Sequence, residues 1–89
     1  MRIQFSDHAL ERIRSPNLTT DQIKEAIANP DEKLSNRFGR IAHKILNDDS
    51  QEKSLLRVFY EENEDEILII SAYKTSKIEK YWKGGFNED

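Results

Sequence analysis

The chain has 89 residues, 36% hydrophobic and 35% charged, which fits one small domain (1–89) with a single core and a highly charged surface. It has no cysteine, which excludes a disulfide framework and a thiolate metal site. The net charge of −3 argues against general nucleic-acid binding, yet seven of the 17 acidic residues lie in two short runs, at 61–66 and 88–89, so a local basic patch stays open. No segment has the pattern of a signal peptide or a membrane span, so we expect a cytoplasmic protein without membrane contact.

The first third of the chain is typical of one short strand and two helices. Residues 2–5 alternate polar and apolar, and Ser6 can cap a helix from 7 to about 14, which ends before a proline. A second helix begins at Thr19, where Gln22 three residues later fits a capping box. The apolar residues of this helix form one stripe: Ile23, Ala26 and Ile27.

The remainder of the chain favours β-structure. Strands are predicted at 33–36, 40–47, 55–61 and 67–73, and a third helix, with Ser76 and Glu79 as its capping box, at 76 to about 82. The strand at 67–73 is apolar on both faces, which predicts a central position. The expected fold is therefore α+β: a mainly antiparallel sheet of four or five strands, two N-terminal helices on one face and a short C-terminal helix.

The junction between the last strand and the third helix is the first candidate site. Tyr73, Lys77 and Tyr81 are spaced four apart, so Lys77 and Tyr81 share a helix face. Two phenols and an ammonium could hold a phosphate or a base. They could equally be an ordinary amphipathic helix end whose stems and rings cover the sheet.

Two cations within the predicted strands form a second candidate. Arg57 projects to the same side of its strand as Leu55 and Phe59. Lys44 is likewise a cation inside a strand, the one before it in the chain. Each should either pair with a carboxylate or face a solvent-filled groove. The alternative is an aliphatic stem that lies along the sheet with its charge at the rim.

The two histidines offer little by themselves. His8 and Arg12 lie one turn apart on the first helix, and an imidazole suits proton transfer near neutral pH. His43 alternates with Ile41 and Ile45, so we interpret it as a partly buried residue of the sheet. We expect no metal site and no cofactor, because the carboxylates lack the spacing of metal ligands.

The order of short motifs resembles a family of small bacterial domains of unknown function related to the RelE and BrnT toxins of type II toxin–antitoxin systems. The motifs that carry the resemblance span nearly the whole chain: 5–12, 26–30, 39–40, 56–60 and 72–77, with Tyr81. The resemblance implies a RelE-like fold and, for many relatives, the toxin half of a toxin–antitoxin pair. Such toxins cleave messenger RNA without a metal.

That resemblance also implies roles for the candidate residues. Arg57 and Lys44, on an open face of the sheet, would stabilise phosphate charge. His8 would be the acid or base, with Arg12 beside it. The three residues at the end of the last strand and in the third helix would orient the RNA backbone or stack against a base: Tyr73, Lys77 and Tyr81.

Two functions from different classes follow. The first is an endoribonuclease whose groove is masked by a small antitoxin encoded next to it. The second is a non-catalytic protein-binding module on the same scaffold, favoured by the acidic run at 61–66 and the pI of about 5.4. Direct DNA binding through the first two helices is disfavoured, because the first is barely two turns long and Lys24 is the sole cation of the second.

Overall fold

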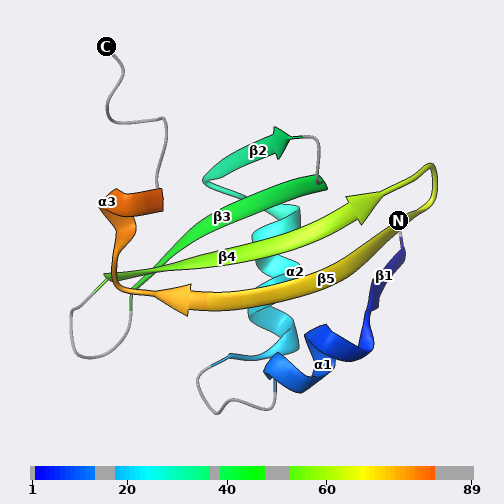
Figure 1. Cartoon of the computed structure of the whole chain (residues 1–89), viewed down its shortest axis with the longest axis horizontal. Helices are drawn as coiled ribbons and strands as arrows, with labels where there is room; N and C mark the ends of the chain where they lie inside the picture. The colour runs from blue at the N-terminus through cyan, green and yellow to red at the C-terminus, as the bar shows by residue number, and fades with distance from the viewer. Residues whose placement is uncertain (1, 14–17, 37–38, 48–52, 82–89) are drawn as a thin grey trace.

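The computed structural model describes residues 2–13, 18–36, 39–47 and 53–81, which form five strands and three short helices (Figure 1). Their bounds are β1 Arg2–Phe5, α1 Asp7–Ile13, α2 Thr20–Ala28, β2 Glu32–Asn36, β3 Gly39–Asn47, β4 Lys53–Glu62, β5 Glu66–Thr75 and α3 Ile78–Tyr81. Each predicted element is present; β1 has the predicted bounds, and the other strands extend one or two residues beyond the predicted limit at one or both ends. No helix within these ranges is long and apolar enough to cross a bilayer.

The five strands form one sheet in the order β1-β5-β4-β3-β2. The pairs β2–β3, β3–β4 and β4–β5 are antiparallel, whereas β1 pairs with β5 in parallel. The fold is therefore α+β with a mixed sheet, because the first strand joins beside the last one. The apolar strand β5 lies inside the sheet, as its sequence predicts, and β4 occupies the centre.

Helix α2 covers one face of the sheet, behind β3 and β4 (Figure 1). The predicted capping box is present: Thr19 Oγ1 accepts from the Gln22 amide, and Gln22 Oε1 accepts from the Thr19 amide, both at 3.1 Å. This start directs the apolar stripe of α2 toward the sheet, and Ile23 and Ala26 are fully buried. The core cluster joins them to Leu18 and to residues of α1, β3, β4 and β5: Ala9, Ala42, Leu56, Val58, Tyr60, Ile67, Ile69 and Ala72, with Ile3 and Phe5 of β1 packed against it.

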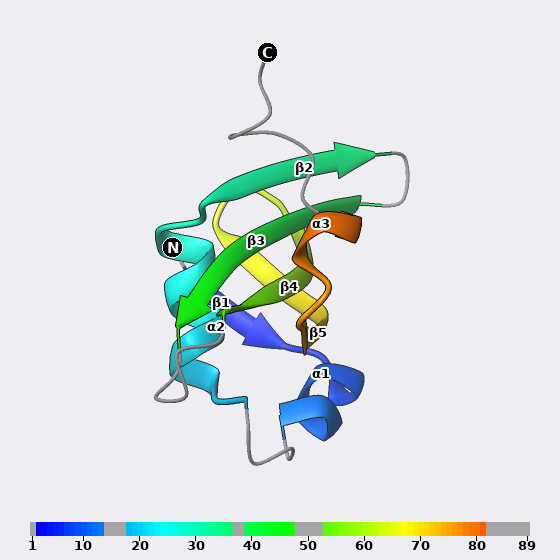
Figure 2. The same cartoon turned by 90° about the vertical axis from the view of Figure 1, so that its left-hand side faces the viewer.

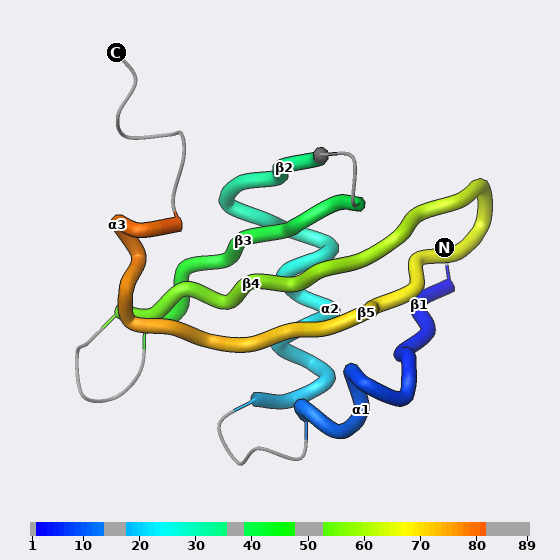
Figure 3. Tube along the Cα trace, viewed as in Figure 1, coloured from blue at the N-terminus to red at the C-terminus, as the bar shows by residue number. Residues whose placement is uncertain are grey.

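Helix α1 follows β1 directly and runs alongside β5 (Figure 3). Ser6 makes the junction, because its hydroxyl accepts from the Ala9 amide at 3.1 Å and donates to the Ile70 carbonyl at 3.0 Å. The parallel pairing of β1 ends at Phe5, opposite Ile69. From Ile70 onward, α1 therefore lies next to β5 in place of a further strand. The predicted end of this helix, at about residue 14, falls outside the described residues.

A β-bulge interrupts the pairing of β4 with β5. Phe59 pairs with Ser71 and Tyr60 with Ile69, so Ile70 has no partner in the register. The extra residue changes the alternation of β5, so Ile69 and Ala72 both reach the core although they are three residues apart. Tyr73 consequently faces away from α2, on the same face as Arg57, with which it pairs.

The second face of the sheet, opposite α2, is covered in part. Leu55 and His43 are fully buried there, so the predicted open face is not open along its whole length. Helix α3 lies on this side of the sheet (Figure 2). It begins at Ile78, later than predicted, and the Lys77 amide donates to Thr75 Oγ1 at 3.1 Å just before it. The predicted end of α3, at about residue 82, lies outside the described residues.

Candidate functional site

Four polar side chains form one row across the second face. The strand register places Glu32 of β2 opposite His43 of β3, His43 opposite Arg57 of β4, and Arg57 opposite Tyr73 of β5. Directly opposed residues have Cβ atoms about 4.5–5.5 Å apart, so their side chains can bond in sequence. The register of four strands thus assembles a continuous polar row from residues far apart in the chain.

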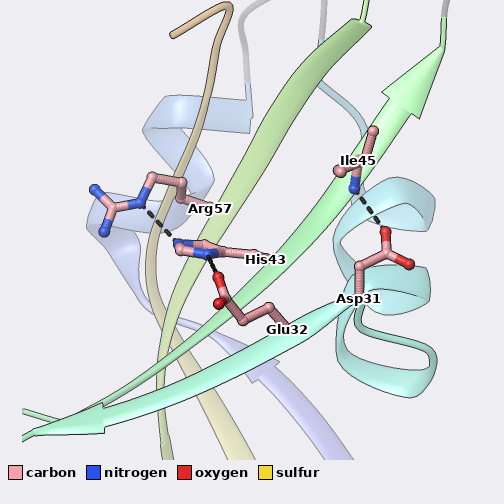
Figure 4. A network of polar contacts seen from close by, with 5 residues as sticks. All are labelled: Asp31, Glu32, His43, Ile45 and Arg57. Carbon is pink, nitrogen blue, oxygen red and sulfur yellow. Dashed lines mark hydrogen bonds and ion pairs between the residues drawn. The ribbon is translucent and has the colours of Figure 1, made fainter. Parts of the chain in front are cut away.

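Hydrogen bonds join the whole row. His43 Nδ1 lies 2.8 Å from Glu32 Oε1, and Arg57 Nε donates to His43 Nε2 at 3.0 Å (Figure 4). At the other end, Arg57 Nη1 donates to the Tyr73 hydroxyl at 2.7 Å. A carboxylate, an imidazole, a guanidinium and a phenol are therefore linked in that order, which fixes the direction of the Arg57 guanidinium.

The imidazole at the centre of this row is deeply buried. His43 has no exposed surface, and the Glu32 side chain is 9% exposed. Burial lowers the pKa of His43 below 6.5, and the positive charge of Arg57 lowers it further, while the hydrogen bond and the charge of Glu32 oppose that shift. Neutral His43 is thus the favoured form near neutral pH.

Three aromatic rings surround the Arg57 guanidinium. Its central carbon lies 4.1 Å from the ring centroid of Tyr81, 5.0 Å from that of Phe59 and 5.7 Å from that of Tyr73. Cation–π attraction at such distances holds the guanidinium without using its N–H donors. Within the described residues, Arg57 Nη2 has no hydrogen-bond partner, and Figure 4 shows this end of the side chain pointing away from His43. Arg57 thus keeps donors for a ligand.

Tyr81 is the member of this aromatic set that α3 contributes. Hydrogen bonding with Tyr73 lowers its pKa below the ordinary value of 10.0. Burial opposes this shift, and the nearby cations Lys80 and Arg57 each lower the pKa by a smaller amount. The rings of Tyr73 and Tyr81 meet edge to face, with centroids 6.4 Å apart. The site therefore contains a phenol that loses its proton more readily than an isolated tyrosine.

A hollow of about 530 Å³ opens next to this aromatic set. It spans α1 and three strands, and its lining is Arg12, Gly39, Arg40, Ile41, Phe59, Tyr60, Glu61, Ile70, Ser71 and Tyr73. Phe59 and Tyr73 belong to both the hollow and the surroundings of Arg57, and their rings are nearly parallel at 16° with centroids 6.1 Å apart. An apolar recess therefore adjoins a fixed cation and has Arg12 on its lining.

The structure brings together four of the predicted site residues. Arg57, Tyr73 and Tyr81 are in mutual contact, and Arg12 reaches the same region from α1 through the hollow. The prediction that Arg57 and the tyrosines form one site at the end of β5 thus has a geometric basis. The other three lie elsewhere.

Lys44 was predicted on the same face as Arg57, and that placement is wrong. Strand alternation turns Lys44 to the α2 face, where its Nζ donates to the Asn29 carbonyl at 2.8 Å and lies 4.0 Å from Glu25 Oε2. Asn29 caps the C-terminus of α2, where a cation is favoured by the helix dipole. Lys44 therefore stabilises a helix end, as a structural residue.

His8 and Lys77 are not joined to the Arg57 site. His8 is exposed on α1 and does not line the hollow that contains Arg12. Lys77 is exposed just before α3, so it does not share a helix face with Tyr81. Their predicted roles as acid or base and as a backbone contact remain predictions.

Sequence reasoning missed Glu32 and underestimated His43 and Phe59. Glu32 was outside the predicted strand, which began one residue later. His43 was interpreted as a partly buried residue of the sheet, whereas it is fully buried. The alternation of the two strands did contain a signal. His43 alternates with Ala42, and Arg57 alternates with Leu56 and Val58, so both polar side chains point away from the core under α2. Pairing them required the β3–β4 register, which a single sequence does not contain.

Metal ligation has no obvious location in this part of the molecule. Within residues 2–13, 18–36, 39–47 and 53–81, no three His, Cys, Asp or Glu side chains are grouped so that they could hold an ion. The carboxylate of the polar row, Glu32, is instead hydrogen-bonded to His43, which in turn accepts from Arg57.

A family model described as a domain of unknown function, DUF4258, matches residues 5–78. The chain belongs to the DUF4258 family. No curated protein and no solved structure matches it. In this DUF4258 domain the matched segment contains the complete row from Glu32 to Tyr73 and also Arg12, whereas Tyr81 lies beyond it. The family boundary thus encloses the Arg57 network.

Proposed function

We propose that this protein is a RelE-like toxin of a toxin–antitoxin pair, a metal-independent endoribonuclease that cleaves mRNA in the cytoplasm. The observation that carries the proposal is the Arg57 guanidinium, which is fixed by His43 and Tyr73 and keeps donors available beside an aromatic recess. A fixed planar cation of this kind suits the oxygens of a phosphodiester, with which guanidinium groups form paired hydrogen bonds.

Arg57 would stabilise the charge that develops on phosphorus during the reaction. The ribose 2′ oxygen forms a bond to phosphorus and the bond from phosphorus to the 5′ oxygen breaks, which leaves a 2′,3′-cyclic phosphate and a 5′-hydroxyl. The phosphorane between these states carries more negative charge on its oxygens than the substrate does. A cation already held in place favours that state without reorganisation, and losing one such donor costs about 10²–10³ in rate.

We assign the removal of the 2′-hydroxyl proton to Tyr81 in its phenolate form, in place of His8. Its ring contacts the Arg57 guanidinium, and Tyr73, Lys80 and Arg57 lower its pKa. A base whose pKa is closer to the working pH is present in its active form more often. The departing 5′ oxygen takes its proton from water.

The recess beside Arg57 would receive a base next to the scissile phosphate. Phe59 and Tyr73 present nearly parallel rings there, and stacking of one base on an aromatic side chain contributes about 1–3 kcal/mol. Arg12, on the lining of the recess, would contact a second phosphate. RNA would therefore lie across β3, β4 and β5 on the second face.

The overall charge limits this activity. Phosphate contacts dominate nucleic-acid affinity, and a protein of net charge −3 that carries Glu61 on the lining of the recess gains little long-range attraction for RNA. We therefore propose weak intrinsic RNA binding at a few local cations, and an antitoxin encoded nearby that masks the recess.

Induced expression of wild type beside Arg57→Ala tests the proposal. Wild type should slow growth and fragment transcripts, and Arg57→Ala should relieve both, because the cation at the phosphate is lost. Arg2→Ala is the matched control, since Arg2 is an exposed arginine of the same sheet whose partner is Glu66 at 3.8 Å, away from the recess. Circular dichroism of each purified variant verifies folding.

Normal growth and intact transcripts with wild type would overturn the ribonuclease. Tight binding to the product of a neighbouring gene under those conditions would instead favour the non-catalytic protein-binding module. Equal loss of toxicity in Arg2→Ala and Arg57→Ala would also contradict the proposal, because a change away from the recess would then have the same effect as the loss of Arg57.

A further inference from the structure

Two side chains behind Arg57 have no contact with the recess, yet they determine where the guanidinium lies. Arg57 Nε carries a hydrogen and acts only as a donor, so its 3.0 Å contact with His43 Nε2 requires a lone pair on that nitrogen. The proton of neutral His43 is then on Nδ1, from which it is donated to Glu32 Oε1 at 2.8 Å. The two contacts independently select the same tautomer.

The other forms of His43 are incompatible with this geometry. With the proton on Nε2, two N–H groups would face each other at 3.0 Å, and the Nδ1 lone pair would face the Glu32 carboxylate. With both nitrogens protonated, Glu32 would still accept, but Arg57 would lose its acceptor and meet a second positive charge. A single state, neutral with Nδ1 protonated, holds Arg57.

We propose that Glu32 and His43 are positioning residues for Arg57: Glu32 holds His43 in the Nδ1-protonated tautomer, and His43 Nε2 then orients the guanidinium toward the recess. This inference rests on the proposed function for the role of Arg57 toward RNA, whereas the positioning itself concerns only the protein. The buried pair acts on RNA by orienting Arg57.

The same geometry makes the positioning sensitive to pH. The charged and titratable groups that face the imidazole in the described part of the chain are Glu32 from β2 and Arg57 from β4, with Tyr73 of β5 and Tyr81 of α3 next to the guanidinium. Protonation of His43 at acid pH would release Arg57. Because Glu32 raises the pKa of His43, removing its charge should move this release to lower pH.

Nitrogen NMR of the purified protein tests the positioning directly. In wild type at neutral pH, His43 Nδ1 should be protonated and Nε2 unprotonated, and the Arg57 Nε–H should exchange slowly with solvent. In Glu32→Ala the exchange should become faster. The affinity for a short single-stranded 2′-O-methyl oligonucleotide, which cannot be cleaved, should fall about tenfold because a hydrogen bond to a charged group is weakened.

Two further variants separate positioning from general stability. Glu32→Gln keeps an oxygen that accepts from Nδ1–H, so Arg57 exchange and oligonucleotide affinity should stay near wild type while the titration midpoint of His43 falls. Asp31→Ala is the matched control. The Asp31 carboxylate accepts from the Ile45 amide at 2.8 Å in the same β2–β3 region (Figure 4). Asp31 meets His43 through the backbone, where its amide donates to the His43 carbonyl at 2.8 Å, and alanine keeps that contact. The loss of the carboxylate should therefore leave all three readouts unchanged.

An Nε2-protonated His43 in wild type would overturn the inference. Unchanged Arg57 exchange in Glu32→Ala would do the same. If the NMR results are as expected but wild type neither binds nor cleaves RNA, the positioning of Arg57 stands and the proposed ribonuclease fails. The two claims are therefore decided by different measurements.

Discussion

Arg57 is held in a fixed orientation and still keeps hydrogen-bond donors for a ligand. Its Nε and one Nη are used by His43 and Tyr73, which fix the side chain, while three aromatic rings lie within 5.7 Å of its central carbon. Such a side chain loses little conformational entropy when a ligand arrives, so more of each new contact appears as affinity. This orientation requires that His43 stays buried and neutral, because its unprotonated Nε2 accepts from Arg57.

The burial of neutral His43 predicts that the free energy of unfolding depends on pH. The pKa of His43 in the folded protein lies below 6.5, so between these two values the unfolded chain binds more protons. The contribution of His43 is therefore fully present above about pH 6.5 and is lost as the pH falls through the folded-state pKa. Urea unfolding at a series of pH values should show the midpoint falling over this window.

His43→Gln should reduce this dependence, because the titrating group is gone, and His8→Gln is the control at an exposed histidine. A pH dependence that is lost in His8→Gln and retained in His43→Gln would contradict the assignment of the buried histidine.

At the scale of elements, local signals predicted more than long-range ones. The caps at Ser6 and Thr19 depend on neighbouring residues, so sequence alone places the starts of α1 and α2 closely. The parallel pairing of β1 with β5 and the bulge at Ile70 depend on contacts between opposite ends of the chain. No local pattern encodes them, which explains why a mixed sheet was not predicted.

Thr19→Ala tests the capping box at the start of α2. The change removes the acceptor of the Gln22 amide and should lower the free energy of unfolding by about 1 kcal/mol. Thr20→Ala, inside the first turn, is the control and should have a much smaller effect because alanine is the better helix former. Chemical denaturation measures both, and equal losses would contradict a specific role of the cap.

At the scale of the whole molecule, the candidate site is a product of sheet register. Its polar row takes one residue from each of β2, β3, β4 and β5, and α1 and α3 add Arg12 and Tyr81 at its sides. The sequence predicted Arg57 and the tyrosines from residue type and alternation. Lys44 was predicted to lie beside Arg57 because both are cations within strands. The register of β3 and β4 instead puts Lys44 on the other face of the sheet, at the end of α2.

The same whole-molecule view explains how an acidic protein could act on RNA. The acidic residues of the β4–β5 turn include Glu64 and Asp65, both exposed, at the end of the sheet away from α3 (Figure 1). Arg57 lies in the half of β4 nearer α3. Local cations and aromatic rings then determine binding, and strong salt dependence is expected because each phosphate contact releases counterions.

The most direct test of the account incubates purified wild type with a single-stranded RNA in the presence of EDTA, beside the same sequence made entirely of 2′-deoxynucleotides. In-line attack by the 2′ oxygen predicts cleavage of the RNA alone, with 2′,3′-cyclic phosphate and 5′-hydroxyl ends, and a loss of about 100-fold or more in Arg57→Ala. Cleavage of the deoxy strand, or RNA cleavage that persists undiminished in Arg57→Ala, would contradict it.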